Sequence, residues 1–366
     1  MSRTIRRTLG VSVVVATSIL IAAGATYGAT AARSATIIGG AGQVGSSGWT
    51  RSVDSVVNTV SSQQIPVGIQ RIGATESPTA KIDGKDDRVK VDVAIIDTGI
   101  DKNHPDLNVV GGVNVTGRGA RNDYRDRDGH GTMVGGIIGA LDNNQGVVGV
   151  APGARLWAVR AYDPDSPISH LPLVRGLNWV ADHADTIDVV NITSAFSYDD
   201  QDPKGGPVDR EIHAAIKRVE RAGVTVVVSA GNESSDTTNY TPARYDEVVA
   251  VSAFTDTDGI PGGRGPDDLD YKDDNFAPFS NFGAEIDLSA PGTGIRSTWP
   301  RNKFKIGDGT SFSAPHVAGA AALFLATHPN ASPEVTKRAL LRSREQVHLP
   351  GDPDTRDEGV VNVKNF

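Results

Sequence analysis

Short apolar runs recur between residues 91 and 253, and glycine, proline or polar residues bound them. Most of these runs are rich in valine and isoleucine and show little alternation, which predicts strands that are buried on both faces of a sheet. The predicted strands cover residues 91–97, 155–161, 188–192, 224–229 and 248–253.

The segments between these strands place their apolar residues at helical spacing instead. Residues 171–183 gather Leu173, Leu177 and Val180 on one face, and residues 208–221 form a second amphipathic segment. Because strands and helices alternate, the pattern predicts an α/β fold. We expect a three-layer, doubly wound, mainly parallel sheet with helices on both faces.

Two further helices are predicted near the C-terminus. Residues 317–326 are apolar on every side, so a helix there would lie inside a core. A helix start is predicted where an N-cap residue, a proline and an acid follow one another, at Ser332, Pro333 and Glu334. The tail after Leu349 is polar, and we expect it to be loosely ordered.

The first 62 residues differ in character from the rest. An arginine-containing start, an apolar run and the small residues 29–31 predict an export signal over residues 1–31. The alternative is an uncleaved membrane anchor, although the run is short and rich in Ser, Thr, Gly and Ala. Residues 32–62 are typical of a linker or a short propeptide, which leaves a folded domain over residues 63–366. We therefore expect a secreted, extracellular protein with no membrane span after cleavage.

Composition narrows the possible chemistry. The chain has 366 residues, of which 38% are hydrophobic, so it can bury one large core. It has no cysteine, which excludes disulfides and thiolate catalysis. Its net charge of −8 becomes −11 when the three arginines of residues 1–31 are removed, and an acidic surface argues against nucleic acid as a partner.

Four polar residues stand at the ends of predicted elements. Asp97 closes a strand, where open α/β sheets place their sites, and Asn232 ends the segment that contains another strand. His130 opens a helix between two glycines, and Ser311 precedes the apolar helix. Taken singly, each residue has an ordinary structural interpretation as a turn former, a packing residue or a helix cap.

The combination of the four residues favours a chemical interpretation. A serine hydroxyl is a poor nucleophile unless a base takes its proton, and the base needs an acid that fixes its tautomer. A tetrahedral acyl intermediate also needs hydrogen-bond donors at its oxygen, which Asn232 and the Ser311 backbone N–H can supply. We therefore expect acyl transfer at Ser311, with His130 and Asp97 assisting.

Five motifs resemble those of the subtilisin-like serine proteases, the subtilases of peptidase family S8. They are DTGID at Asp97, HGT at His130, GVVGVAPGA at residues 146–154, SAGN ending at Asn232 and GTSFSAPHVAG around Ser311. The resemblance runs from about residue 63 to the C-terminal helices. It implies a subtilisin-like fold and hydrolysis of peptide bonds through an acyl-enzyme. By the same resemblance, Asp97 orients His130, His130 is base and then acid, Ser311 attacks and Asn232 stabilises the oxyanion.

The resemblance also implies a substrate cleft, in which this chain departs from the family. The cleft positions are Thr193, Ser194, Ala195, Ser229, Ala230 and Gly231. Where the family has Asn-Met-Ser-Leu-Gly-Gly, this chain has Asn-Ile-Thr-Ser-Ala-Phe at residues 191–196. We expect Ala195 and Phe196 to narrow the cleft. Met133 replaces the family's second histidine, and we expect it to be a packing residue.

A structural calcium ion is a further implication of the resemblance. The matching positions are Gln63, Asp106, Leu141, Asn143, Gln145 and Val147. Oxygen ligands in a loop suit Ca²⁺, although a solvated turn is the alternative. Residues 256–274 form an acidic insert, which we expect to be a solvated surface loop, with a second cation site as the alternative.

The leading hypothesis is therefore a secreted, monomeric serine endopeptidase that is stabilised by calcium and acts on polypeptides. One alternative is a pseudoprotease, which would bind peptides or a partner in the altered cleft without turnover. Another keeps the serine chemistry but directs it to esters, because acyl-enzyme machinery does not by itself demand amides. The sequence does not identify the preferred substrate residues.

Overall fold

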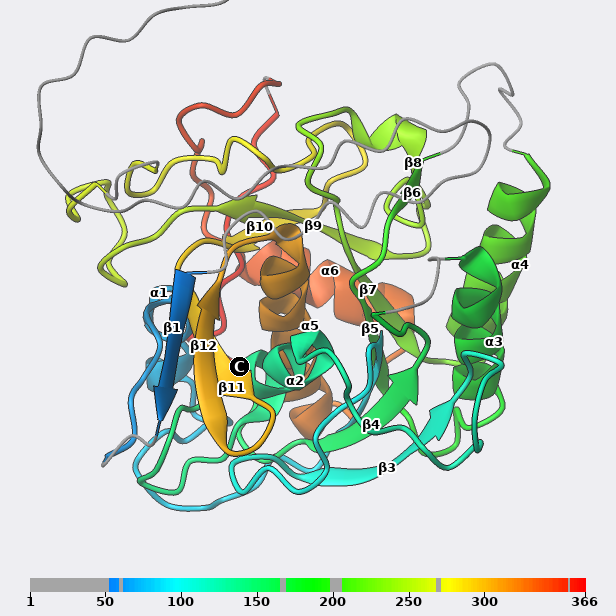
Figure 1. Ribbon diagram of the computed structural model, residues 1–366. Helices are drawn as coiled ribbons and strands as arrows, with labels where there is room; N and C mark the ends of the chain where they lie inside the picture. Colours follow the sequence, from blue (N-terminus) through cyan, green and yellow to red (C-terminus); the bar gives the residue numbers. More distant parts are fainter. Residues whose placement is uncertain (1–52, 59–61, 165–168, 198–205, 268–270, 355) are drawn as a thin grey trace, which may run out of the picture. The chain divides into compact units, whose positions relative to one another are not determined.

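The computed structural model describes residues 53–58, 62–164, 169–197, 206–267, 271–354 and 356–366. The predicted export signal and most of residues 32–62 lie outside the described residues. Within residues 53–58, strand β1 (Val53–Asn58) pairs antiparallel with β12 (Lys303–Gly307), which also pairs with β11 (Ile295–Trp299). The segment expected to be a linker or propeptide thus contributes a strand (Figure 1).

The central sheet is parallel throughout, and its strand order is β10-β9-β7-β5-β2-β4-β3. Its strands are β2 (Asp92–Asp97), β3 (Val109–Asn114), β4 (Arg155–Arg160), β5 (Val189–Ile192), β7 (Thr225–Ser229), β9 (Val249–Phe254) and β10 (Leu288–Pro291). The five strands predicted from apolar runs are therefore confirmed. All the strands point the same way, so their carboxyl ends share one edge of the sheet.

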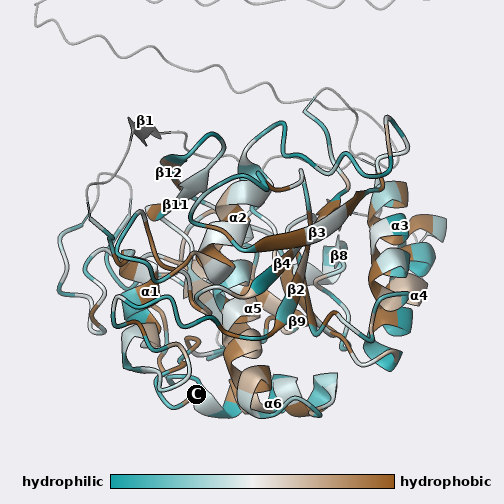
Figure 2. Ribbon diagram, turned by 90° about the horizontal axis from the view of Figure 1, so that it is seen from below, coloured by the Kyte–Doolittle hydropathy of each residue, from teal (hydrophilic) through white to brown (hydrophobic). Residues whose placement is uncertain are grey.

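Helices cover both faces of this sheet, as Figure 2 shows. On one face lie α2 (His130–Gly139) and α5 (Thr310–Thr327), and on the other lie α3 (His170–Ala181) and α4 (Pro207–Arg221). Successive side chains of a strand alternate between these faces. Accordingly, Ile95 packs in the core with α2 and α5, whereas Ala94 and Ile96 pack in the core with α3 and α4. The predicted three-layer α/β architecture is confirmed.

The remaining elements of the described residues are smaller. They are α1 (Val67–Arg71), the 3₁₀ helices η1 (Ala74–Glu76) and η2 (Thr237–Asn239), the two-stranded pair β6 (Phe196–Ser197) and β8 (Tyr240–Thr241), and α6 (Pro333–Ser343). Ser332 caps α6, because its side chain accepts a hydrogen bond from Val335 N. The predicted N-cap is thus confirmed. Among the described residues, no helix has the length and apolarity needed to cross a membrane.

The C-terminal tail differs from the sequence prediction. We expected the residues after Leu349 to be loosely ordered, but Val360, Val361 and Val363 are fully buried. Val361 N donates to Ser289 O and Val363 N donates to Ile72 O, which ties the tail to β10 and to the end of α1. Three valines in a short polar stretch were too sparse to give a periodic signal, and their burial depends on contacts that are distant in sequence.

Candidate active site

Asp97 is the last residue of β2 and is almost fully buried. Its carboxylate accepts hydrogen bonds from Thr98 N (2.7 Å) and Thr193 Oγ1 (2.5 Å), and both of its oxygens lie 2.8 Å from His130 Nδ1. Burial alone would raise the pKa of Asp97, but the neighbouring His130 and the Thr193 hydroxyl outweigh that effect and hold the pKa below its usual value. The residue is therefore a buried carboxylate that remains charged.

His130 is the first residue of α2, and its ring faces Asp97. The close approach of the two elements depends on Gly131, where a Cβ atom would lie 2.1 Å from the carbonyl oxygen of Gly99. Burial would lower the pKa of His130, but the charge of Asp97 and its hydrogen bond raise it above the ordinary value. Because the carboxylate accepts from Nδ1–H, the neutral ring has its lone pair on Nε2, which is the nitrogen that can receive a proton.

Ser311 is the second residue of α5, and Thr193 connects it to Asp97. Its Oγ donates to the carbonyl oxygen of Thr193 over 3.4 Å, and Thr193 also contacts Asp97 through its hydroxyl. The ring of Phe312, the next residue, is tilted against the His130 ring with 5.3 Å between the ring centroids. The structure thus brings the starts of α2 and α5 together at the carboxyl end of β2.

Asn232 stands opposite the same helix start. Its Oδ1 accepts from Thr310 N (2.8 Å) and from Thr310 Oγ1 (2.9 Å). A backbone N–H can only donate, so this contact fixes the oxygen of the carboxamide toward Thr310 and turns the Nδ2 group away from it. The pattern of residues in the sequence does not identify Thr310 as the residue that orients Asn232. Its position beside Ser311 in the GTS motif is the only signal that the sequence offers.

The six predicted cleft residues fall into two groups around this site. Ser229, Ala230 and Gly231 are buried, and Gly231 N donates to the Thr310 hydroxyl over 3.2 Å. Thr193, Ser194 and Ala195 are partly exposed. They follow β5, which is the strand next to β2.

Phe196 differs from the expectation that it narrows the cleft. Its side chain is only 3% exposed and belongs to the core between the sheet, α3 and α4. The backbone of Phe196 pairs with Thr241 in the small β6–β8 sheet, and this pairing turns the side chain inward. Met133, by contrast, packs as expected, since it is 1% exposed in the core beside α5.

The residues expected to hold calcium also lie together. Gln63 Nε2 donates to Leu141 O (3.2 Å), and Gln63 Oε1 accepts from Asn143 N (3.1 Å). Asp106 accepts from Asn143 Nδ2 (3.2 Å) and from Val147 N (3.0 Å). Gln145 N donates to the side-chain oxygen of Asn143 (2.9 Å).

Asp106 is the only carboxylate in this set, and it is 3% exposed. Burial raises its pKa to about 7, and its contacts with Val147 and Asn143 only partly oppose that effect. A cation would counter the cost of burying this charge. The donor set, with one carboxylate, amide oxygens and backbone carbonyls, therefore fits a hard cation such as Ca²⁺.

Within the described part of the chain, two other groups of acidic residues are spaced as ligands of a metal ion would be. They are Asp256 with Asp258 and Asp273, and Asp352 with Asp354 and Glu358. The first group lies in the acidic insert, which we expected to be solvated. Instead, Asp256, Asp273 and Asp274 are buried, and Arg71 Nε lies 2.9 Å from Asp256 Oδ2 and 3.1 Å from Asp274 Oδ1. The buried Arg71 thus forms ion pairs with two acids of the insert. The pattern of acidic residues in the sequence did not indicate this partner.

Comparisons with known proteins agree with these motifs. The model of the subtilase family matches residues 89–362. The chain is 34% identical over 306 residues to subtilisin DY of Bacillus licheniformis, which covers 82% of this chain and 98% of that protein. It is 35% identical over 271 residues to subtilisin E of Bacillus subtilis, covering 73% of this chain and 62% of that protein. It is 32% identical over 313 residues to a thermostable alkaline protease of Halalkalibacterium halodurans, covering 86% and 76% respectively.

Proposed function

This chain belongs to the subtilase family and is a subtilisin-like serine endopeptidase, and we propose that Ser311, His130, Asp97 and Asn232 perform its chemistry. The observation that carries the proposal is the contact of 2.8 Å between His130 Nδ1 and the buried Asp97 carboxylate, beside the start of the helix that bears Ser311. A buried carboxylate that fixes the tautomer of a histidine next to a serine is the arrangement that activates a serine hydroxyl.

In the proposed mechanism, Ser311 Oγ attacks the carbonyl carbon of the scissile peptide bond while His130 Nε2 takes the hydroxyl proton. Asp97 stabilises the imidazolium that forms. The Asn232 Nδ2 group and the backbone N–H of Ser311 donate to the oxyanion of the tetrahedral intermediate. His130 then gives its proton to the leaving amine, which leaves an acyl-enzyme on Ser311. Water attacks this ester while His130 takes its proton, and His130 then returns that proton to Ser311 Oγ as the ester bond breaks and the carboxylic acid product leaves.

Labelling with a fluorophosphonate tests this assignment. Mass mapping of the folded protein should place a single adduct on Ser311, because only an activated serine reacts quickly with the probe. The Ser311→Ala variant should be folded and unlabelled, since it lacks the attacking atom. If the folded wild-type protein forms no adduct, the proposed triad is wrong and a peptide-binding role without turnover becomes the better account. Comparing hydrolysis of a matched peptide amide and ester separates a peptidase from an esterase.

We also propose that one calcium ion stabilises the domain. Asp106 and Gln63 would supply side-chain oxygens, as would Asn143, and the backbone carbonyls of Leu141, Gln145 and Val147 would complete the set. The ion would offset the charge of the buried Asp106 and cross-link the N-terminal segment to the loop after α2. It would have no part in the acyl transfer. The support for this proposal is the convergence of these residues and the burial of the carboxylate.

The enzyme's working environment belongs to the same proposal. We propose that residues 1–31 direct export, that the mature protein acts outside the cell as a monomer, and that its substrates are polypeptides. A chain without cysteine gains no stability from disulfides, which is consistent with the proposed use of calcium. N-terminal sequencing of the secreted protein tests the export proposal, because the mature chain should begin after residue 31.

A further inference from the structure

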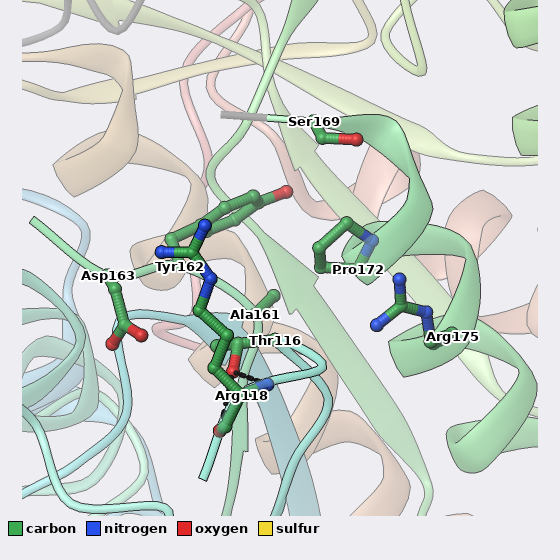
Figure 3. A pocket seen from close by; sticks show the side chains of 8 residues that line it. All are labelled: Thr116, Arg118, Ala161, Tyr162, Asp163, Ser169, Pro172 and Arg175. Atoms are coloured by element: carbon green, nitrogen blue, oxygen red, sulfur yellow. Dashed lines mark hydrogen bonds between the residues drawn. The ribbon is translucent and has the colours of Figure 1, made fainter. Parts of the chain in front are cut away.

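A pocket of about 270 Å³ lies at the same edge of the sheet as the candidate active site. It is bounded by the loop after β3, by the residues that follow β4 and by the first turns of α3 (Figure 3). Because β4 is hydrogen-bonded to β2 and β3 is the next strand, the pocket lies one to two strands away from Asp97. Neighbouring strands are about 4.8 Å apart and an extended peptide advances about 3.3 Å per residue. A substrate side chain within about three residues of the scissile bond can therefore reach the pocket.

A chain of contacts joins the pocket to the proposed nucleophile. Tyr162 lines the pocket, and its hydroxyl donates to Ser194 Oγ over 2.7 Å. Ser194 follows Thr193, whose carbonyl oxygen accepts from Ser311 Oγ. The pocket and the reacting serine are thus separated by two residues of the predicted cleft, and a peptide that lies along the cleft passes both.

The charges of the pocket walls favour an anion. Arg118 enters from the loop after β3 and Arg175 from α3, and Figure 3 shows their guanidinium groups on two sides of the pocket. Arg175 Nη1 donates to the carbonyl oxygen of Val115 over 2.8 Å, a neutral partner that positions the guanidinium and leaves its charge in place. The acidic residue of the lining, Asp163, is paired with Arg160, whose side chain is almost fully buried. Among the described residues that line the pocket, two arginines therefore accompany one carboxylate, which a further arginine already pairs.

The size of the pocket limits its occupant. Sites for whole small-molecule ligands usually measure about 300 to 1,000 Å³, so a volume below that range suits a single side chain. A guanidinium presents five N–H donors in a planar fork that matches a carboxylate, and more than one of them remains available when one donates to a carbonyl. An aspartate or glutamate side chain combines the charge, the shape and the length that this pocket accommodates.

We propose that this pocket binds an acidic side chain of the peptide substrate, and that Arg118 and Arg175 make the enzyme prefer aspartate or glutamate near the scissile bond. The inference rests on the proposed function, because it assumes that peptides lie in the cleft beside Ser311. It adds a substrate class, which the catalytic residues alone do not define.

Matched peptides that carry glutamate or glutamine at each position within three residues of the cleaved bond test this preference. At one position the glutamate peptide should be cleaved with a kcat/KM about tenfold higher, the size expected for one hydrogen-bonded charge. The preference should shrink toward unity in Arg175→Gln and in Arg118→Gln, and Arg175→Glu should favour lysine instead. It should also weaken at high salt, because these arginines are exposed.

Arg221→Gln is the matched control, because it removes the same charge from an exposed arginine at the end of α4. It should keep the preference of the wild type. Equal cleavage of the glutamate and glutamine peptides at every position would overturn the proposal, as would a preference that survives in the Arg118 and Arg175 double variant.

Binding measurements on Ser311→Ala separate this inference from the proposed function. The same peptides, titrated against this variant, should show about tenfold tighter binding of the glutamate form. If the wild type fails to cleave any peptide while Ser311→Ala still prefers glutamate, the proposed function is wrong and the acidic-side-chain pocket stands. If cleavage occurs and neither assay distinguishes the two peptides, the pocket proposal is wrong and the proposed function stands.

Discussion

The hydroxyl of Thr193 donates to Asp97 Oδ2 over 2.5 Å, so a residue of the predicted substrate cleft also holds the buried carboxylate. The backbone carbonyl of the same threonine accepts from Ser311 Oγ. Thr193 therefore links the residue proposed to orient the base with the residue proposed to attack. In the sequence it appears only as one part of the segment in which this chain departs from its family, and nothing in the pattern indicates that its hydroxyl points to Asp97.

Thr193→Val should lower kcat by about tenfold to a hundredfold with little change in KM. The substitution keeps the shape of the side chain but removes a hydrogen bond to a buried charge, which contributes about 1.5–3 kcal/mol. Steady-state kinetics with a peptide substrate measure the effect. Thr193→Ser retains the hydroxyl and should restore most of the rate. Unchanged kcat in a folded Thr193→Val protein would show that the contact does not assist catalysis.

The pH profile of kcat/KM should have an acidic limb centred above pH 6.5. His130 must be neutral to accept the serine proton, and Asp97 raises its pKa above the ordinary value of 6.5 despite the opposing effect of burial. Activity is therefore lost as pH falls through this raised pKa. Asp97→Asn should lower kcat by about 10⁴, because it removes the charge and permits the wrong tautomer.

Asp128→Asn provides a milder test of the same electrostatics. Asp128 also raises the pKa of His130, but less than Asp97 does, and it accepts a hydrogen bond from the backbone N of His130 rather than from the ring. The acidic limb should move to slightly lower pH while kcat on the plateau changes little.

A limb centred at or below pH 6.5 in the wild type would contradict the assignment of His130 as the base.

Asn232→Ala should lower kcat by about 10² to 10³ and leave KM nearly unchanged, the range seen when the oxyanion-binding asparagine is removed from a subtilisin. The reason is that its Nδ2 group would donate only to the oxyanion that forms during the reaction. Thr310→Val offers a graded comparison, because it removes one of the two donors that anchor Asn232 Oδ1. It should cost less than Asn232→Ala. A neutral result for Asn232→Ala would remove this residue from the mechanism.

Local patterns in the sequence predict the parts of this fold that depend on local physics. The apolar runs around Ile95 and Val227 identify central strands, because a strand buried on both faces needs apolar side chains on both sides. The cap at Ser332 is likewise encoded within one helical turn. Motifs in family order place Asp97, His130, Ser311 and Asn232 at element ends, and the structure brings their side chains into one region.

The features that the sequence did not reveal depend on partners distant along the chain. The sequence predicted that Phe196 lines the cleft, but its backbone pairs with Thr241 and its side chain packs in the core. The sequence predicted that Asp256 is solvated, but it forms an ion pair with Arg71, which is distant in the sequence. Arg118 and Arg175 come from separate elements and form one pocket only because β3 and α3 meet there. In each case the residue has no distinguishing local pattern, and its structural role depends on a contact with a residue that is distant in the sequence.

Calcium should raise the melting temperature by about 5 °C, and the increment over a sample in chelator should grow from pH 5.5 to pH 8. In the ion-free protein, burial raises the pKa of Asp106 from 3.8 to about 7. The protonated carboxyl group therefore stabilises the fold at low pH, and this stabilisation is lost as the pH rises from 3.8 through 7. The ion should restore this stability by pairing with the charged carboxylate, and protons compete with it below pH 7.

Asp106→Asn should therefore abolish most of the calcium increment, as calorimetry in calcium and in chelator can measure. Asp258→Asn, in the acidic insert, is the matched control and should keep the increment. If Asp258→Asn loses it and Asp106→Asn does not, the stabilising ion belongs to the insert and the site at Asp106 is wrong.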